Sequence, residues 1–405
     1  MPAPYYFLRP ILAPDLSWAA LDWQSNALLN TDFSTFVQCF ANSAAEPLGE
    51  TLPFVLPIPP EVLFQDELLR LIDRSRLIFV FPASVMANDR AIEKCRAIHN
   101  AGKQLALNIE SADTLRSIPL TAFNAIRFDA AFARQEFKPQ DFVYAKDAGF
   151  RKIATNVDSY EMFSWLKEKG VEWSASHFLT TPNPHRGKEP DLARLKLLKL
   201  LNLVKQDGDT RDIEAIFREE AKLSYNLLRL VNSVAVGARI KINNFSQAIA
   251  ILGRHQLQRW LQLLIYANNL TDGNIPNPLM QLAAARGRQM ELLSAAITPA
   301  PDIPELSDNA FMVGLFSLLG VLINLPMTEI LKEIPLQDVV TDALGNPADD
   351  GVLGQLLTAI SAGEAGKFDA SAQILSNLGI NQGIHIKSQV SAYHWASRIN
   401  HDHHN

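Results

Sequence analysis

The first 180 residues alternate between short apolar runs, rich in β-branched and aromatic residues, and longer segments with helical periodicity. This alternation is typical of a parallel α/β layout, in which a helix follows each strand and packs on the sheet. We expect strands at four apolar runs, residues 77–81, 104–109, 125–128 and 152–155. Helices are expected at 89–101 and 159–169, and each is followed by a glycine that can take the left-handed backbone conformation needed before the next strand.

Two earlier apolar runs, 5–12 and 18–23, are separated by only a few residues. They are too close to be a parallel pair, because a parallel crossover needs about a dozen residues or more. The sheet is therefore predicted to begin with an antiparallel pair.

Residues 180–190 combine three prolines with polar residues and a glycine, which is the composition of an exposed connection. Beyond this stretch the pattern is helical, with no convincing strand alternation. We therefore predict an α/β domain at 1–182, built as a barrel or an open sheet, a linker at 183–190 and an all-helical domain at 191–405.

Composition is ordinary for a folded protein, with 48% hydrophobic and 20% charged residues among 405. The net charge of −6 gives no reason to expect a DNA partner. Cys39 and Cys95 lack CxxC spacing and are interpreted as buried thiols of a reducing compartment. The most apolar stretch, 310–325, is interrupted by polar residues, and residues 1–12 do not resemble a signal peptide. We expect a cytoplasmic protein with no membrane partner.

Residues 159–182, with Val-Glu-Trp-Ser-Ala-Ser-His-Phe-Leu-Thr-Thr-Pro at their end, resemble the close of the barrel in the EAL family of cyclic-di-GMP phosphodiesterases. The resemblance covers nearly the whole first domain and implies an EAL-type (β/α) barrel. In catalytic members of that family, carboxylates at strand ends hold two divalent cations that activate a water for attack on phosphorus.

The resemblance also implies that this metal set is degenerate. The Glu-Ala-Leu motif falls on Ala19-Ala20-Leu21, and the Lys-x-Asp motif falls on Arg127-Phe128-Asp129. The family's remaining carboxylate and polar positions fall on Phe79 to Pro82, Asn108, Ile109, Thr155, Asp158, Ala175 and Ser176. Arg127 and Asp129 are therefore the remnant candidates for any surviving ligand site.

The runs 221–233 and 240–254 look like the signature helix of the HDOD domain and the segment that follows it. HDOD domains resemble HD-type metal-dependent phosphohydrolases, in which an adjacent His-Asp pair holds the metal. Here that pair falls on Ser317-Leu318. His255, His385 and His394 are widely separated and are interpreted as capping or half-buried residues.

The leading hypothesis is a non-catalytic bacterial signal-transduction protein without cofactors or a metal site, acting through protein contacts in a cyclic-di-GMP-related pathway. The alternative is an effector that binds cyclic-di-GMP without hydrolysing it. A third hypothesis is an unrecognised hydrolase that uses Glu110, Asp129, Asp158 and His177. The last is a metal-dependent phosphodiesterase or phosphohydrolase of the EAL or HD type. The sequence specifies neither the protein partner nor the oligomeric state.

Overall fold

The computed structural model describes residues 4–26, 33–65, 68, 76–176, 178–181, 247, 258–259, 262–263, 278–323, 325–333, 336–347 and 351–399. The expected signature run 221–233, the segment 240–254 and His255 lie outside these residues. The chain divides into two compact units. The first comprises Met1–Leu179, Ala362–Gln373 and Asn381–Ser391, and the second comprises Thr180–Ser361, Ile374–Ile380 and Ala392–Asn405. The predicted linker at 183–190 is not described, so the domain boundaries stay a prediction.

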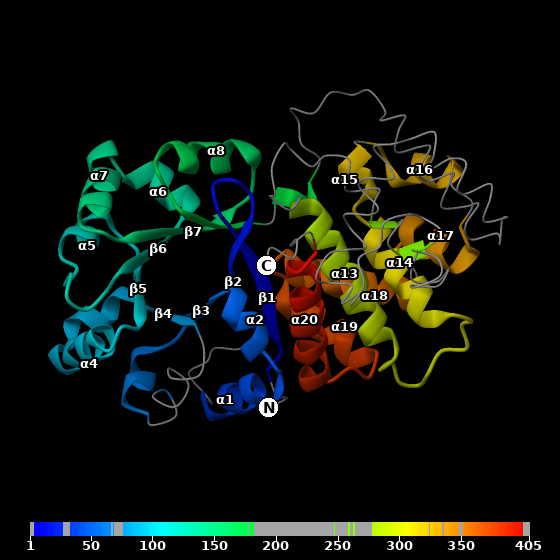
Figure 1. The fold of residues 1–405 in the computed structure, drawn as a ribbon, viewed down its shortest axis with the longest axis horizontal. Helices are drawn as coiled ribbons and strands as arrows, with labels where there is room; N and C mark the ends of the chain where they lie inside the picture. The colour runs from blue at the N-terminus through cyan, green and yellow to red at the C-terminus, as the bar shows by residue number, and fades with distance from the viewer. Residues whose placement is uncertain are drawn as a thin grey trace. The chain divides into compact units, whose positions relative to one another are not determined.

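Eight strands of the first unit close into a barrel in chain order (Figure 1). They are β1 (Tyr6–Leu12), β2 (Trp18–Ser25), β3 (Phe54–Pro57), β4 (Leu77–Phe81), β5 (Gln104–Ile109), β6 (Ala125–Asp129), β7 (Arg151–Val157) and β8 (Trp173–Ser176). The strands β2 to β8 are parallel, while β1 is antiparallel to both β2 and β8. The predicted barrel and its antiparallel opening pair are confirmed.

Helices join the strands and cover the outside of the barrel. They are α1 (Phe33–Asn42), α2 (Glu46–Thr51), α4 (Asp89–Asn100), α5 (Ala112–Arg116), α6 (Ala130–Glu136), α7 (Pro139–Asp147) and α8 (Tyr160–Glu168), with short 3₁₀ helices at Pro60–Phe64, Ala83–Ala87 and Phe178–Thr180. The side chains of Asn88 and Ser159 cap α4 and α8 by accepting hydrogen bonds from the first turn. As predicted, Gly102 and Gly170 follow these helices with φ of +79° and +70°.

Small and branched side chains fill the barrel interior, because alternate residues of each strand point inward. This interior cluster consists of Ile11, Ala20, Val55, Ile78, Val80, Ala106, Ala125, Ile153 and Ala175. On the outer face of β2, Trp23 packs against the rings of Phe36, Phe40 and Phe54. The interior is thus packed with apolar side chains at one level, which leaves polar chemistry to the strand ends.

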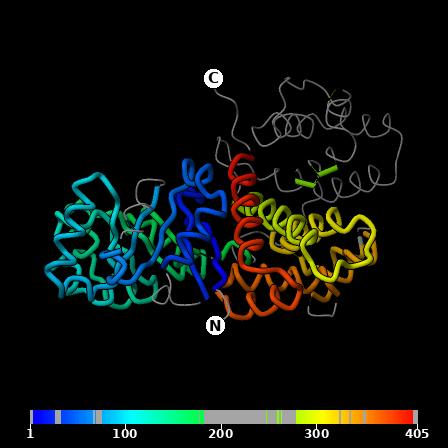
Figure 2. The backbone as a smooth tube through the Cα atoms, turned by 90° about the horizontal axis from the view of Figure 1, so that it is seen from below, coloured from blue at the N-terminus to red at the C-terminus, as the bar shows by residue number. Residues whose placement is uncertain are grey.

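The chain returns to the first unit after residue 361, through parts of α18 (Val352–Glu364), α19 (Phe368–Asn377) and α20 (Gln382–Ser397). Gln389 binds the backbone of Leu8 in both directions: its Oε1 accepts from Leu8 N at 2.9 Å, and its Nε2 donates to Leu8 O at 3.2 Å. In Figure 2 the red start of α20 lies beside the blue N-terminal strands. The first unit therefore combines the N-terminal barrel with two segments from late in the chain, Ala362–Gln373 and Asn381–Ser391.

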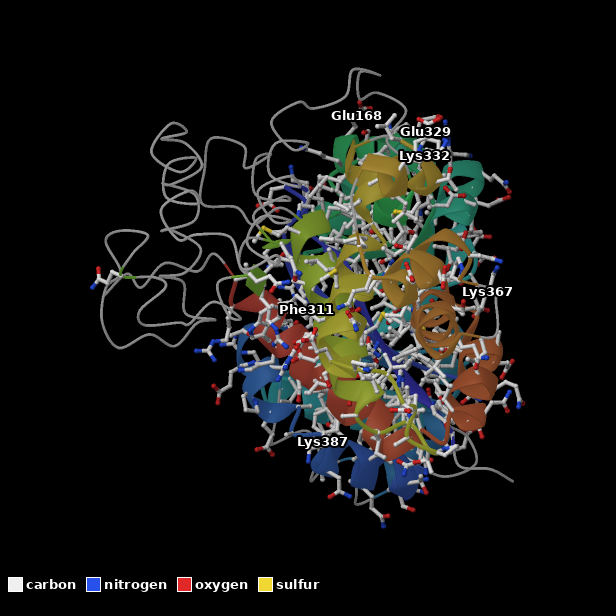
Figure 3. All side chains as sticks on the ribbon, turned by 90° about the vertical axis from the view of Figure 1, so that its right-hand side faces the viewer. Glu168, Phe311, Glu329, Lys332, Lys367 and Lys387 are labelled. Carbon is white, nitrogen blue, oxygen red and sulfur yellow. The ribbon has the colours of Figure 1, made fainter. Side chains whose placement is uncertain are left out.

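The described part of the second unit contains helices and no strand. Besides the remaining turns of α18 to α20, these helices are α13 (Pro278–Ser294), α14 (Leu306–Phe316), α15 (Leu319–Ile323), α16 (Met327–Glu333) and α17 (Asp338–Gly345). α13 and α14 cross closely, since a Cβ on Gly314 would lie 2.7 Å from the Cα of Gly287. Beside this crossing, the Arg259 guanidinium binds Glu291 and Asp308 and lies 5.1 Å from the ring centroid of Phe311, which is labelled in Figure 3.

The two cysteines differ in exposure. Cys95 is buried as predicted, whereas Cys39 is only half-buried, which corrects the expectation for that residue. Burial raises the pKa of Cys39 to about 11 and that of Cys95 to about 12. No helix in the described ranges is long and apolar enough to cross a bilayer.

Candidate functional site

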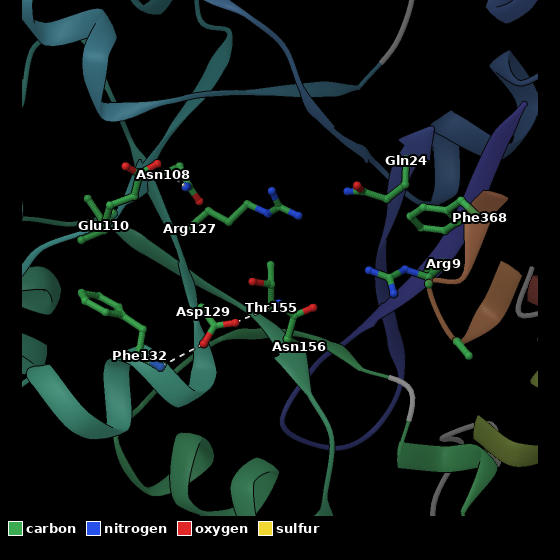
Figure 4. A pocket seen from close by; sticks show the side chains of 13 residues that line it. Arg9, Gln24, Asn108, Glu110, Arg127, Asp129, Phe132, Thr155, Asn156 and Phe368 are labelled. Atoms are coloured by element: carbon green, nitrogen blue, oxygen red, sulfur yellow. Dashed lines mark hydrogen bonds between the residues drawn. The ribbon is translucent and has the colours of Figure 1, made fainter. Parts of the chain in front are cut away.

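A cavity of about 620 Å³ opens at the carboxyl ends of the parallel strands, where barrels of this kind carry their chemistry. Its walls come from strand ends, from the first turn of α6 and from the turn between α18 and α19 (Figure 4). The lining residues are Arg9, Gln24, Asn108, Ile109, Glu110, Arg127, Asp129, Phe132, Thr155, Asn156, Ala365, Gly366 and Phe368. Most of these side chains are polar or charged, so the mouth suits a polar ligand better than an apolar one.

Asp22 is not itself a lining residue, but its completely buried carboxylate contacts two arginines that line the cavity. Its Oδ2 lies 3.4 Å from Nη2 of Arg127 and 3.6 Å from Nη2 of Arg9. Arg9 faces Asp22 directly across the β1–β2 pair, and Arg127 comes from β6. In Figure 4 the two guanidinium groups point toward one another. Two positive charges of the cavity lining therefore meet one buried negative charge.

This cluster keeps unused hydrogen-bonding capacity. Oδ1 of Asp22 and Nε of both arginines are buried and have no hydrogen-bond partner in the described part of the chain. The buried Nε2 of Gln24, which also lines the cavity, has none either. Buried polar atoms without partners are costly, and functional sites are among the places where proteins keep them.

Asp129 lines the cavity and uses its carboxylate to hold neighbouring parts of the wall together. Its Oδ1 accepts from the backbone N of Phe132 at 2.9 Å and so caps α6, while its Oδ2 accepts from Nδ2 of Asn156 at 2.8 Å. Asn156 takes a left-handed backbone with φ of +55°, which asparagine tolerates better than most residues. Both oxygens of Asp129 are thus engaged by neighbours that also line the mouth.

The neighbouring strands contribute neutral polar groups. Asn108 at the end of β5 donates from Nδ2 to Oε1 of Glu110 at 3.3 Å. Thr155 on β7 donates from Oγ1 to the carbonyl oxygen of Phe128 at 3.2 Å. The wall between β5 and β7 therefore presents amide and hydroxyl groups around the Arg127 guanidinium.

The structure brings the two remnant candidates, Arg127 and Asp129, into one cavity together with Asn108 and Thr155. Their assignment as a ligand site stays a prediction. Of the residues in the hydrolase hypothesis, Glu110 also lines the cavity, Asp158 is not among the lining residues, and His177 lies outside the described residues. Glu161, three residues after Asp158, forms an ion pair with Arg134 on the surface at 2.8 Å.

The strand register refines the position of the Glu-Ala-Leu motif. Ala20 belongs to the interior cluster, so alternation along β2 turns Ala19 outward and Asp22 inward. The residue to which the sequence assigned the lost glutamate therefore faces away from the mouth. The first inward position beyond Ala20 carries the buried Asp22.

Sequence reasoning did not identify Arg9, Asp22 and Gln24 as site residues. A signal was present, because Asp22 interrupts the apolar run Trp18 to Trp23 at the same strand parity as Ala20. A charged residue inside a strand that is otherwise apolar needs a buried partner. Arg9 lies on the other strand of the predicted opening pair, whereas Arg127 is more than a hundred positions away and nothing around Asp22 in the sequence indicates it.

Among the described side chains, no group of three or more His, Cys, Asp or Glu residues is arranged to hold a metal ion. The mouth places two arginines beside its buried carboxylate, and positive charge there opposes cation binding. The residues that the structure describes at the mouth therefore do not fit a two-cation site.

Comparison with known proteins identifies the helical part of the chain. Residues 192–337 match the family model described as "HDOD domain". This region is an HDOD domain. The chain is also 22% identical over 379 residues to "Uncharacterized protein YuxH" of Bacillus subtilis, covering 90% of this chain and 86% of that protein. It is 22% identical over 369 residues to "Cyclic di-GMP phosphodiesterase CdgJ" of Vibrio cholerae, covering 90% of this chain and 79% of CdgJ.

Among solved structures, the crystal structure of the EAL domain of Mycobacterium smegmatis DcpA is similar to this chain, at 14% sequence identity and a TM-score of 0.35. The alignment covers 43% of this chain and 90% of the DcpA chain. The family resemblance seen in the sequence, an EAL-type barrel fused to an HDOD domain, agrees with the match to the HDOD family model and with the closed barrel of eight strands.

Within the HDOD domain, the position that the sequence assigned to the metal-binding histidine is occupied by a hydrogen-bonded serine. Ser317 Oγ donates to the carbonyl oxygen of Gly314 at 2.6 Å and accepts from Nη1 of Arg286 at 2.6 Å. Of the three histidines considered, His385 is completely buried rather than capping or half-buried, at 1% exposure, and belongs to the first unit.

Proposed function

We propose that this protein is a non-catalytic regulator in a cyclic-di-GMP signalling pathway that acts through protein contacts. The pathway is suggested by the similarity to CdgJ over 90% of the chain. The non-catalytic role is supported by one observation above others, the position of the buried Asp22 carboxylate between the guanidinium groups of Arg9 and Arg127.

The physical argument concerns charge. A pair of divalent cations needs several oxygen ligands of negative charge around a shared water. Here the buried carboxylate of Asp22 already has two guanidinium groups beside it. Both carboxylate oxygens of Asp129 accept hydrogen bonds, from Phe132 N and Asn156 Nδ2. Cations placed between these groups would meet Arg9 and Arg127 at close range, which is unfavourable.

Hydrolysis is the direct test. The purified full-length chain is incubated with cyclic-di-GMP and Mg²⁺ or Mn²⁺, with CdgJ assayed in parallel as the positive control. We expect no linear product above the rate without protein. Metal-dependent hydrolysis that disappears in Asp129→Ala would overturn the non-catalytic role.

The protein-contact half of the proposal needs its own test. A partner captured in cells is purified and recombined with this chain, and their complex is measured at equilibrium by analytical ultracentrifugation. We expect a defined stoichiometry that persists in Arg127→Gln. No complex between the purified components would count against the proposal.

A second candidate function is binding of cyclic-di-GMP without hydrolysis, and the composition of the mouth favours it. Two guanidinium groups and the amides of Asn108, Gln24 and Asn156 line one cavity. Guanidinium forks match phosphate oxygens, and amides suit the edges of bases.

Calorimetry tests this second function. We expect heat on titration of cyclic-di-GMP into the wild type and a large loss of affinity in Arg127→Gln. Arg134→Gln is the matched control, because Arg134 forms an exposed ion pair with Glu161 and does not line the cavity. Absence of heat and of thermal stabilisation at high micromolar ligand would remove this candidate.

A further inference from the structure

The inner face of β1 continues beyond the barrel mouth. Ile11, Arg9 and Phe7 alternate with outward residues and therefore share one face of the strand. Ile11 belongs to the interior cluster and Arg9 lines the cavity, so Phe7 is the next inward side chain on the rim side of Arg9. An apolar ring at this place has no barrel interior left to fill and needs another cover.

Residues 362–373 and the start of α20 supply that cover within the first unit. The ring of Phe368 stacks on Phe7 with centroids 4.9 Å apart, and His385 lies 5.0 Å from Phe7 on another side. Gly363 approaches so closely that a Cβ there would lie 2.9 Å from Cδ1 of Phe7. Phe7 is accordingly only 1% exposed.

The same segment reaches Arg9. The Arg9 guanidinium carbon lies 5.6 Å from the centroid of Phe368, within the range of a cation–π interaction. Gly366 has φ of +77°, and a Cβ on it would lie 3.2 Å from Nη1 of Arg9. Ala365, Gly366 and Phe368 thus form the wall of the mouth behind this arginine, as Figure 4 shows for Phe368.

Asp22 alone does not fix Arg9. Their contact is a single pair of atoms at 3.6 Å, whereas strong arginine–carboxylate pairs are bidentate and shorter than about 3 Å. Nε of Arg9 has no hydrogen-bond partner in the described ranges. The guanidinium plane must therefore take much of its orientation from the ring of Phe368 and the bare backbone at Gly366.

We propose that Gly366 and Phe368 are positioning residues for Arg9, and that they link occupancy of the barrel mouth by an anionic ligand to the docking of residues 362–373. Undocking of the segment removes one wall of the mouth and releases Arg9 from it. A ligand that contacts Arg9 and this wall binds the docked state better, and by thermodynamic reciprocity it tightens the docking. The linkage rests on the second candidate function, whereas the positioning of Arg9 does not.

The positioning is tested without any ligand. In full-length protein labelled with ¹⁵N-arginine, the Nε–Hε resonance of Arg9 is assigned from its loss in Arg9→Lys. We expect Phe368→Leu to shift this resonance and speed its exchange with water, and Phe368→Tyr to restore both. An Arg9 resonance that is unchanged in a folded Phe368→Leu protein would overturn the proposal.

Phe64 provides the matched control. It also carries an arginine over its ring, with Arg90 Cζ 5.1 Å from the centroid, but neither residue lines the mouth. Phe64→Leu should move the Arg90 resonance and leave that of Arg9 in place. If Phe64→Leu shifts Arg9 as much as Phe368→Leu does, the effect is a general loss of packing and the proposal fails.

The linkage is tested with cyclic-di-GMP as the probe. Hydrogen–deuterium exchange of peptides covering 362–373 is compared with and without saturating ligand. We expect slower exchange on binding, and affinity at least about 5-fold weaker in Phe368→Leu, the lower end of typical coupling between sites. Calorimetric binding with unchanged exchange in 362–373 would refute the linkage. If no binding occurs, the second candidate function and the linkage fall together, and the resonance test still decides the positioning of Arg9.

Discussion

Asp22 is the residue that balances the charges of the barrel mouth, because its buried carboxylate faces two arginines whose side chains are each 14% exposed. Without it, two largely buried guanidinium groups would lie close together with no negative charge between them. Removing one partner of a buried ion cluster leaves uncompensated charge, which costs more than the intact cluster contributes.

We therefore expect Asp22→Asn to lower the free energy of unfolding by about 3 to 5 kcal/mol, the usual cost of breaking a buried ion pair. Urea denaturation followed by tryptophan fluorescence measures the change. The control is Glu161→Gln, which removes an exposed pair with Arg134 and should cost less than about 1 kcal/mol. Equal effects of the two substitutions would mean that the Asp22 cluster contributes no more than a surface pair.

His385 is a second residue with a measurable electrostatic consequence. Burial beside the rings of Tyr5 and Phe7 lowers its pKa from 6.5 to about 4, and a backbone contact of Tyr6 opposes the shift only in part. The unfolded chain therefore binds a proton more readily than the folded chain between pH 6.5 and 4. The neutral form favours the folded state, so its contribution is complete above pH 6.5 and is lost as the pH falls.

The expected loss for His385 is about 3 kcal/mol on acidification from pH 7 to 4, from 1.36 kcal/mol per pKa unit. Urea denaturation at half-unit pH steps, compared between the wild type and His385→Leu, isolates it from other titrations. The difference between the two curves should change with pH only within this window. A constant difference would contradict the assignment to His385.

At the level of elements, the crossing of α13 and α14 depends on two glycines. A Cβ on Gly314 would lie 2.7 Å from the Cα of Gly287 and 2.8 Å from the carbonyl oxygen of Arg286. Both obstacles are backbone, so a side chain there forces the helices apart rather than moving a flexible neighbour.

Gly314→Ala is expected to destabilise the second unit by about 1 to 3 kcal/mol, as overpacking does elsewhere. Thermal unfolding followed by far-ultraviolet circular dichroism reports the change. Gly345→Ala is the matched control, since a Cβ there would meet only Cδ1 of Leu331 at an ordinary 3.5 Å. If the Gly314→Ala protein has the same melting temperature as the wild type, the close approach of α13 and α14 is not needed for the stability of the second unit.

The elements best predicted from the sequence are those whose signals are local. β4 and β5 have the predicted bounds because each is a short apolar run between helix-ending and turn residues. The caps at Asn88 and Ser159 depend on side chains that reach only three residues ahead. The polar character of the mouth at Arg127 and Asp129 was also visible, through the order of motifs along the strands.

The features that escaped prediction join distant parts of the chain. Leu8 and Gln389 are 381 positions apart, and nothing in the sequence around either residue indicates the contact. The contacts of Gly366 and Phe368 with β1 also join distant parts of the chain. The helical pattern of this region does not indicate which strand the region packs against. The burial of His385 follows from that packing, and for this reason it too was missed.

For the molecule as a whole, the first unit depends on a segment that follows the HDOD domain in sequence. Tyr5 and Phe7 are buried at 8% and 1% exposure, and their covering rings come from residues 362–391. A fragment that ends near the predicted domain boundary would expose both rings and leave the backbone groups of Leu8 without Gln389.

We expect residues 1–181, produced alone, to show no cooperative thermal transition. The same fragment joined by a flexible linker to residues 362–391 should recover one, because the linker restores the cover on β1. Near-ultraviolet circular dichroism during heating distinguishes the two. A cooperative melt of 1–181 by itself would show that the barrel is an independent domain ending near residue 182.

The contact between Leu8 and Gln389 has a consequence for biosynthesis. A ribosome makes the glutamine that pairs with β1 381 residues after Leu8, at about 5 to 20 residues per second. During that interval the nascent barrel carries an uncovered aromatic strip and an unpaired strand edge, which are the features that chaperones recognise and that promote aggregation. Translation speed and chaperone supply should therefore affect the yield of this protein more than that of a barrel whose strands are complete before its second domain is made.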